Sequence, residues 1–314
     1  MLALTHPVPA GDAQAAVFAH AVGRRKGTVT TISERLPVLR TRRALYRIPA
    51  ARRPGLMERR DVLDALARAA MPWRTVRRWL LGAMTGPAWA AVLPSMSYQD
   101  RLEHLPEFDR LDVRAEGLAA ELADPARVLW SGVTPLEIVA ALRQVPGSRW
   151  TPALRRAADL SVANVPALPG RTLVLVDRTA SMADPAWPGS PLTRGDAAAA
   201  FGAAVASRAA SADLVQCGTV TARVPVGPGE PLTTVLARFG PLDGTTGPAA
   251  AVRHLAAGHD RVIILTHPST AAQAAEAVTI PGHEHVVTSP VPGWFRAIPY
   301  IEAARTAAWP FVTQ

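Results

Sequence analysis

The 314 residues include a single cysteine, Cys217, which excludes an internal disulfide and a cysteine-rich zinc module. No stretch approaches the roughly 20 unbroken apolar residues that a membrane-spanning helix needs. The first nine residues lack the basic segment and the apolar core of a secretory signal. These absences predict a soluble protein of the reducing cytoplasm that has no membrane partner.

Hydrophobic residues make up 49% of the chain and charged residues 19%. This balance is typical of a globular protein and excludes an intrinsically disordered one. The length is large for one domain and suits two.

Positive charge is concentrated in the first half of the chain. The net charge is +9, and residues 1–160 hold 24 basic and 15 acidic groups, whereas residues 161–314 hold ten of each. Residues 24–78 alone carry 16 basic groups against four acidic ones. Lys26 is the only lysine, so nearly every positive charge is a guanidinium, which suits phosphate oxygens and can stack on bases.

A field this concentrated attracts a polyanion, which favours a nucleic acid as the partner. A solvated arginine-rich surface remains the alternative, although it does not explain the uneven distribution. Anionic lipid is less favoured, because no strongly amphipathic basic helix has exposed aromatic flanks. The candidate RNA-binding residues are Arg40, Arg42, Arg43, Arg52, Arg53, Arg74, Arg77 and Arg78.

The first half of the sequence reads as short helices without a strand signal. The clearest helix start is Thr134-Pro-Leu-Glu137, where a cap, a first-turn proline and a glutamate form a capping box. The tryptophans Trp73, Trp79 and Trp89 have helical spacing, which favours a core position over base stacking. Further helices are predicted over residues 13–22, 61–69, 73–84, 89–93, 97–105, 114–122 and 151–160.

Residues 161–170 are predicted to form a hinge, after which strands alternate with helices. This alternation predicts a mostly parallel, doubly wound sheet. We therefore expect an α + α/β protein with a basic α-helical domain over residues 1–165 and an α/β domain over residues 166–314. The strands are predicted at 172–176, 213–219, 221–226, 261–266 and 285–288, and the helices at 193–210, 232–239, 246–257, 270–278 and 298–308.

Two predicted strands end in polar residues, where parallel sheets place their ligands. The first strand runs into Asp177, Thr179 and Ser181, and another into Thr266 and His267. The loop that contains Thr245 lies between them in the sequence. Carboxylate and hydroxyl oxygens are hard ligands that suit Mg²⁺ or another divalent cation. The alternative is that these side chains only satisfy loop amides.

Residues 164–182 read Asn-Val-Pro-Ala-Leu-Pro-Gly-Arg-Thr-Leu-Val-Leu-Val-Asp-Arg-Thr-Ala-Ser-Met. This run closely resembles the linker and metal-site entry of the Ro/TROVE family of RNA-binding proteins. Residues 210–219 resemble the second strand of that family, and residues 89–105 and 107–113 resemble its helical half. The resemblance extends from about residue 60 to the end.

The resemblance implies a HEAT-like helical repeat joined to a von Willebrand factor A domain. It implies a metal site that consists of Asp177, Thr179, Ser181 and Thr245. It also implies that the partner is a small non-coding Y-like RNA or a misfolded RNA, and that the protein acts as a scaffold in RNA quality control. Two departures stand out. His267 replaces the family's third-motif aspartate, which predicts weaker Mg²⁺ binding or a degenerate site. The helical half is also shorter than in the family, which predicts an open arc of helices or a truncated paralogue.

Catalysis is not expected from the residues around Asp177. A phosphatase of the haloacid dehalogenase type needs a second carboxylate where Thr179 stands. Ser181, His267 and Asp177 lack the Gly-x-Ser-x-Gly elbow of a hydrolase, and no phosphate-binding glycine loop follows the first strand. The alternative to RNA binding is a protein-interaction module that grips a partner carboxylate through a cation, as in a metal-ion-dependent adhesion site.

Overall fold

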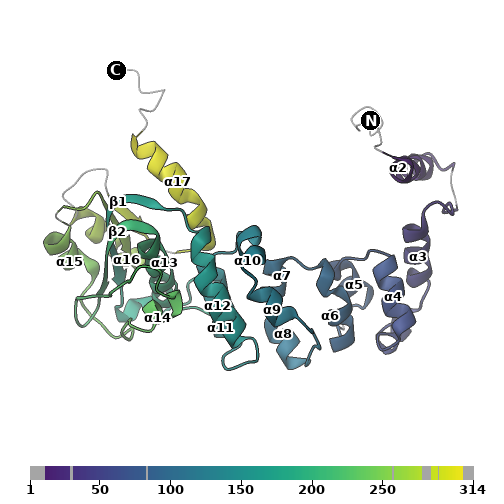
Figure 1. The fold of residues 1–314 in the computed structure, drawn as a ribbon, viewed down its shortest axis with the longest axis horizontal. Coiled ribbons are helices and arrows are strands. Elements are labelled where there is room, and N and C mark those ends of the chain that lie inside the picture. Colours follow the sequence, from purple (N-terminus) through teal and green to yellow (C-terminus); the bar gives the residue numbers. More distant parts are fainter. Residues whose placement is uncertain are drawn as a thin grey trace, which may run out of the picture. The chain divides into compact units, whose positions relative to one another are not determined.

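The computed structural model describes residues 11–28, 31–82, 84–256, 258–277, 284–288 and 290–306, and these form a helical part followed by an α/β part (Figure 1). The predicted α + α/β class is confirmed. None of the described helices combines the length and the apolar composition that crossing a membrane requires.

Short helices occupy the chain as far as residue 164. The α-helices are α2 (Asp12–Arg25), α3 (Pro37–Tyr46), α4 (Arg60–Arg68), α5 (Trp73–Trp79), α6 (Gly86–Val92), α7 (Tyr98–Glu103), α8 (Leu105–Arg110), α9 (Leu118–Leu122), α10 (Pro125–Ser131), α11 (Pro135–Gln144) and α12 (Thr151–Ser161). Four 3-10 turns accompany them: η1 (Ala50–Arg52), η2 (Pro54–Leu56), η3 (Leu93–Ser95) and η4 (Val162–Asn164).

Strands and helices alternate from residue 168 onward. The strands are β1 (Leu168–Asp177), β2 (Ala209–Cys217), β3 (Ala222–Arg223), β4 (Arg261–Leu265) and β5 (Glu284–Val287). The helical elements are η5 (Ala180–Ala183), α13 (Arg194–Arg208), α14 (Leu232–Leu236), α15 (Pro248–Leu255), α16 (Pro268–Glu276) and α17 (Pro292–Thr306).

The sheet has the order β3-β2-β1-β4-β5, in which all pairs are parallel except β2 with β3. Helices cover both faces. Gly202 of α13 lies against Val174 and Val176, since a Cβ atom there would come within 2.9 Å of Val176 Cγ2. The alternate β1 residues Leu173 and Leu175 share the other core with α15 and α16. The predicted doubly wound, mostly parallel sheet is therefore confirmed.

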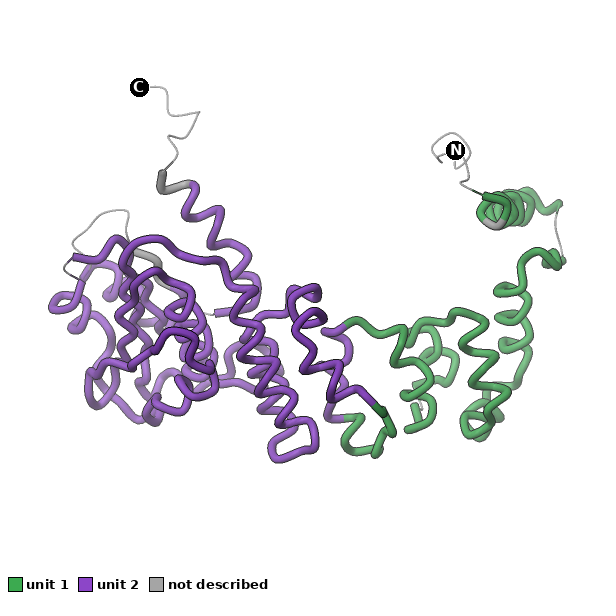
Figure 2. The backbone as a smooth tube through the Cα atoms, in the orientation of Figure 1, with its two compact units in different colours: residues 1–97, 107–116 green, residues 98–106, 117–314 purple. Residues whose placement is uncertain are grey.

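The chain forms two compact units (Figure 2). Unit 1 contains residues 1–97 and 107–116, and unit 2 contains residues 98–106 and 117–314. The last helices of the helical part belong to unit 2, because α11 packs on α13 and α12 on α14. The predicted boundary between residues 165 and 166 falls between η4 and β1, and the division of the chain into domains over 1–165 and 166–314 stays a prediction.

Unit 1 is built around buried aromatic rings. Trp89 is fully buried, with ring centroids 5.9 Å from Trp73 and 5.2 Å from Phe108. Trp79 is also buried and donates its indole N–H to the Leu45 carbonyl at 3.1 Å. These three tryptophans are therefore core residues, as their helical spacing predicts.

Some predicted element boundaries are wrong. The predicted helix over 73–84 ends at Trp79, because Leu81 and Gly82 adopt left-handed backbone angles, and the predicted helix over 114–122 begins after the left-handed Gly117. The hinge over 161–170 contains η4 and the start of β1. The predicted strand over 221–226 shrinks to two paired residues. The predicted helix ends at 257, 278 and 308 lie outside the described residues.

Candidate nucleic-acid interface and strand-end site

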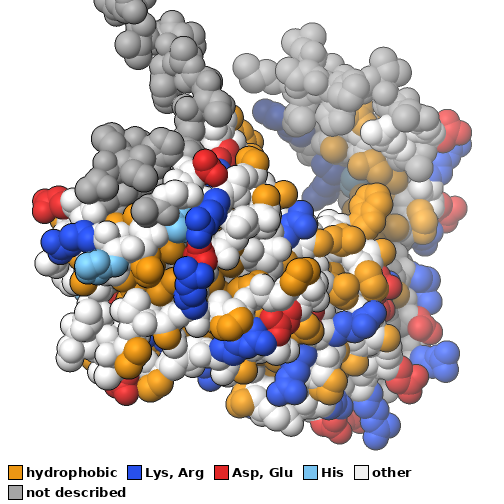
Figure 3. Space-filling view, turned by 60° about the vertical axis from the view of Figure 1, so that its left-hand side comes forward, with side chains coloured by type: hydrophobic (Ala, Val, Ile, Leu, Met, Phe, Trp, Pro, Cys, Tyr) orange, Lys and Arg blue, Asp and Glu red, His pale blue; other side chains and the backbone are white. Residues whose placement is uncertain are grey.

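The net positive charge of the chain belongs to unit 1. Unit 1 contains 18 basic and nine acidic residues, and unit 2 contains 16 of each. All eight candidate arginines lie in unit 1, on or directly beside three helical elements, α3, η1 and α5. The structure therefore brings the candidates into one compact unit. Basic side chains stand out from the surface in the space-filling view of Figure 3, interspersed with acidic ones.

Most of the candidate arginines reach solvent. Arg43, Arg52, Arg77 and Arg78 are exposed, as is Arg74, whose guanidinium lies 4.9 Å above the Trp73 ring. Their exposure lets phosphate oxygens approach these side chains from solvent.

Arg40 is exposed as well and lies 3.7 Å from Glu34, in a pair whose side chains are 54% and 90% exposed. Such an exposed pair contributes about 0.2–1 kcal/mol and is readily exchanged for another partner. Arg40 therefore stays among the candidate contacts.

Two candidates also have structural contacts. Arg42 donates from Nε to the Ala69 carbonyl at 2.7 Å and from Nη2 to the Ala70 carbonyl at 2.6 Å, which caps the end of α4. Arg53 donates from Nη1 to the Trp79 carbonyl at 2.8 Å, at the end of α5. Both add to the positive charge of unit 1, but several of their N–H donors bind backbone carbonyls within the fold.

One exposed aromatic residue is not identified by the sequence pattern. Trp130 on α10 is 91% exposed and follows Arg127, which is half-exposed, by one helical turn. A seven-residue helix is too short to show an amphipathic pattern, so no sequence signal predicts which way this side chain faces.

At the strand ends, Asp177 is fully buried and hydrogen-bonded through both oxygens. Oδ1 accepts the Thr179 amide at 2.8 Å, and Oδ2 accepts the Thr266 hydroxyl at 2.5 Å. The Thr179 and Ser181 hydroxyls lie 2.9 Å apart. The predicted clustering of β1-end and β4-end polar residues is therefore present.

The loop that contains Thr245 lies beside this cluster through its backbone. Gly244 pairs with Thr179 as a parallel bridge, and the Ala180 amide donates to the Gly244 carbonyl at 3.0 Å. The Thr245 side chain itself is exposed. Gly244 is needed at this position, because a Cβ atom would lie 2.2 Å from the Cα of Gly218.

We expect Gly244→Ala to destabilise unit 2 by about 1–3 kcal/mol, since the clash is with backbone that cannot rotate away. Urea denaturation measures the loss. Gly293→Ala is the matched control, because a Cβ atom there meets nothing within 4 Å. Equal stability of the two variants would show that the loop does not pack as described.

His267 has a structural role in addition to its place beside the cluster. It caps α16, with Nδ1 accepting the Ser269 amide at 3.2 Å and lying 2.7 Å from the Ser269 hydroxyl. Nδ1 is thereby occupied.

The donor set fits a divalent cation only weakly. It offers one carboxylate, Asp177, whose two oxygens already accept hydrogen bonds, and two hydroxyls that bond to each other. The described residues contain no group of three or more histidine, cysteine or acidic side chains placed to hold a metal ion. Asp177, Thr179 and Ser181 are the residues that would hold Mg²⁺ here.

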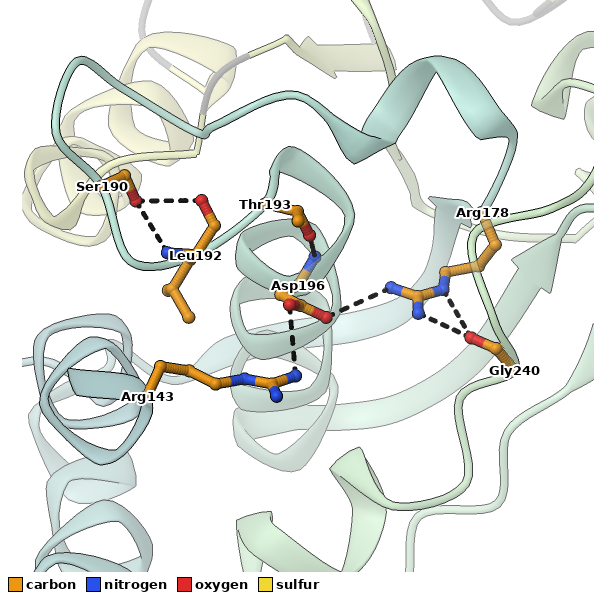
Figure 4. A network of polar contacts seen from close by, with 7 residues as sticks. All are labelled: Arg143, Arg178, Ser190, Leu192, Thr193, Asp196 and Gly240. Carbon is orange, nitrogen blue, oxygen red and sulfur yellow. Dashed lines mark hydrogen bonds and ion pairs between the residues drawn. The ribbon is translucent and has the colours of Figure 1, made fainter. Parts of the chain in front are cut away.

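Behind the strand end, a buried arginine ties three elements together (Figure 4). Arg178 donates from Nε and Nη2 to the Gly240 carbonyl at 3.0 and 2.6 Å, and its Nη1 lies 4.0 Å from Asp196 of α13. Burial lowers the pKa of Arg178, and Asp196 opposes that shift. Asp196 Oδ2 also accepts a hydrogen bond from Nη2 of Arg143, on α11, at 3.2 Å. The network fixes the β1 end against α13 and against the 240–244 loop.

Cys217 ends β2 opposite Asp177. Burial, with the Asp177 carboxylate nearby, raises the pKa of its thiol to about 12. The thiol therefore stays protonated at neutral pH and is a core group, as the sequence indicates.

No protein-family model matches this sequence, and no curated protein matches it. Its structure is similar to the crystal structure of the Ro (RSR) protein of Deinococcus radiodurans, with a TM-score of 0.65 and 17% identity. The similarity covers 97% of this chain and 69% of that chain. The chain has a Ro-like fold. This Ro-like architecture extends through the helical part as well as the sheet.

Proposed function

We propose that this Ro-like protein binds RNA through the exposed arginines of unit 1, without catalysing a reaction. The observation that carries the proposal is the confinement of the net charge to unit 1, where five candidates, Arg43, Arg52, Arg74, Arg77 and Arg78, are exposed. The Ro-like fold supports it, since the sequence resemblance links that fold to RNA. The expected ligands are small structured or single-stranded RNAs, including Y-like and misfolded ones.

The physical basis is the release of counterions. Each arginine that neutralises a phosphate releases condensed cations, so the logarithm of the affinity falls with the logarithm of the salt concentration by about 0.7 per contact for single strands. Guanidinium groups add bidentate hydrogen bonds to phosphate oxygens. The six exposed candidates, which include Arg40, would give a slope of about −4 if all contact phosphates.

A filter-binding titration of a single-stranded RNA between 50 and 300 mM KCl tests the proposal. We expect a slope steeper than about −2, corresponding to three or more phosphate contacts. A flat salt dependence, or no retention of RNA at 50 mM KCl, would refute it.

Trp130, on α10 of unit 2, is a second candidate for RNA contact that is separate from the arginines of unit 1. Its indole is 91% exposed, and Arg127 precedes it by one helical turn. A ring that can stack on a base therefore lies one turn from a guanidinium that can donate hydrogen bonds to a phosphate. We expect Trp130→Ala to weaken single-stranded RNA binding by about 1–3 kcal/mol, with the salt slope unchanged. Leu129→Ala, at the exposed neighbouring position, is the control. Equal affinities of the two variants would remove Trp130 from the interface.

A second candidate function, a cation-dependent protein interaction, is favoured by the adjacent Thr179 and Ser181 hydroxyls. It has weaker support, because Asp177 is the only carboxylate in the cluster. Pull-down from the native host with and without EDTA tests it. Partners that are lost both with EDTA and in Asp177→Asn would support this function, and indifference to both treatments would exclude it.

A further inference from the structure

A cavity of about 200 Å³ lies within unit 2, apart from both sites described above. Its walls come from α7, α11 and the segment between η5 and α13, and Pro292 at the start of α17 adds to the lining. Two of these segments follow β1 and β5. The cavity therefore lies at the carboxyl edge of the parallel sheet, where such folds bind ligands.

The lining combines small and apolar residues with acidic, amide and aromatic side chains. Glu103 and Glu137 contribute carboxylates, Gln99 and Gln144 contribute amides, and Trp187 contributes an indole. No basic side chain is found among the described residues that line it. In a chain with a net charge of +9, this combination disfavours phosphates and carboxylates as ligands and favours a cation.

The two carboxylates retain oxygens for a ligand. Glu137 uses Oε2 in the capping box, where it accepts the Thr134 amide at 2.7 Å and the Thr134 hydroxyl at 2.8 Å. Its other oxygen has no such role. Glu103 is exposed, and no ion pair involves it within the described part of the chain.

The wall that carries Trp187 is rigid. The Ser190 hydroxyl accepts the Leu192 amide and donates to the Leu192 carbonyl, both at 3.0 Å (Figure 4). The Ser190 amide donates to the Trp187 carbonyl at 2.9 Å, and Pro185 bridges Thr193. A braced segment presents its indole at little cost in conformational entropy on binding.

We propose that this cavity binds the guanidinium group of an arginine side chain from a protein partner. A planar cation can lie against the Trp187 indole while Glu103 and Glu137 accept its N–H donors. The proposal is independent of RNA binding by unit 1, because none of the residues involved is among the candidate arginines or their neighbours.

Calorimetric titration of the full-length protein with N-acetyl-arginine amide tests the proposal. We expect saturable binding in the millimolar range. The citrulline analogue, which keeps the shape but lacks the charge, is expected to bind about tenfold more weakly. Glu103→Gln and Trp187→Leu are each expected to weaken the arginine probe about tenfold. Glu276→Gln, an exposed acid away from the cavity, is expected to change nothing.

Equal binding of the arginine and citrulline probes would overturn the proposal, as would unchanged binding to Glu103→Gln. Guanosine monophosphate serves as a third probe. If it binds and Trp187→Leu removes its binding, the cavity holds a nucleobase and the assignment to a partner arginine is wrong. Glu103 is exposed, so its variant is expected to fold, and thermal melting of each variant checks this.

Discussion

Simultaneous replacement of Arg43, Arg77 and Arg78 by glutamine is expected to weaken single-stranded RNA binding by about 100-fold near 0.1 M salt. Each lost arginine–phosphate contact removes about 1 kcal/mol, and 1.4 kcal/mol corresponds to a factor of ten. The salt slope should become shallower by about 2, since three contacts are lost. All three side chains are exposed, so the fold should be retained.

The matched control replaces Arg155, Arg156 and Arg296 by glutamine. These are exposed arginines of unit 2, whose net charge is zero, and the substitution changes the total charge by the same amount. We expect the control to lose less than about threefold in affinity, because its charges are not part of the excess in unit 1. If both triple variants lose affinity to the same extent, total charge governs binding and the candidate interface is wrong.

The second large effect concerns the core of unit 1. Trp89→Ala is expected to lower the free energy of unfolding by about 3–5 kcal/mol, since it removes a fully buried ring that contacts Trp73 and Phe108. Chemical denaturation followed by circular dichroism measures the change. A loss of this size is enough to unfold a marginally stable unit.

Trp130→Ala is the control for this experiment, because its ring is 91% exposed. We expect a stability change within about 0.5 kcal/mol. A loss for Trp89→Ala of the same small size would mean that the aromatic core is not packed as described. The pair of variants also separates the two roles of tryptophan, because one stabilises the fold and the other is proposed to contact RNA.

The sequence predicted the parts of the structure that depend on local chemistry. The capping box of Thr134 and Glu137 forms as expected, and Asp177 lies at the end of a strand buried in the sheet. The change from helices to alternating strands and helices was also readable, because the periodicity changes from helical spacing to continuous apolar runs. These signals depend on a few neighbouring residues.

Short helices and tertiary contacts could not be predicted in the same way. The sequence predicts no helix over residues 125–131, yet Asp124 caps α10 there by accepting the Arg127 amide at 2.8 Å. A cap before a proline can end one helix and begin the next. Similarly, the contacts of Arg42 with carbonyls 27 and 28 residues away depend on packing that no local pattern encodes.

In the candidate sites too, the residue types could be predicted from the sequence, whereas their spatial arrangement could not. The charge excess was evident from the sequence, but its confinement to unit 1 required the structure, since the unit boundary lies within the helical part. The strand-end oxygens were identified from their spacing, whereas their mutual hydrogen bonds appear only in three dimensions. The acidic cavity combines α7, α11 and the loop before α13, which are far apart in the sequence.

Ultraviolet crosslinking of the protein to the RNA that copurifies with it from its native host, followed by mass spectrometry of the crosslinked peptides, tests the central claim most directly. Binding through unit 1 predicts crosslinked peptides within residues 24–78, at or next to the exposed arginines of α3 and α5. The recovered RNA would also identify the ligand. Absence of copurified RNA, or crosslinks that leave residues 24–78 untouched, would contradict the account.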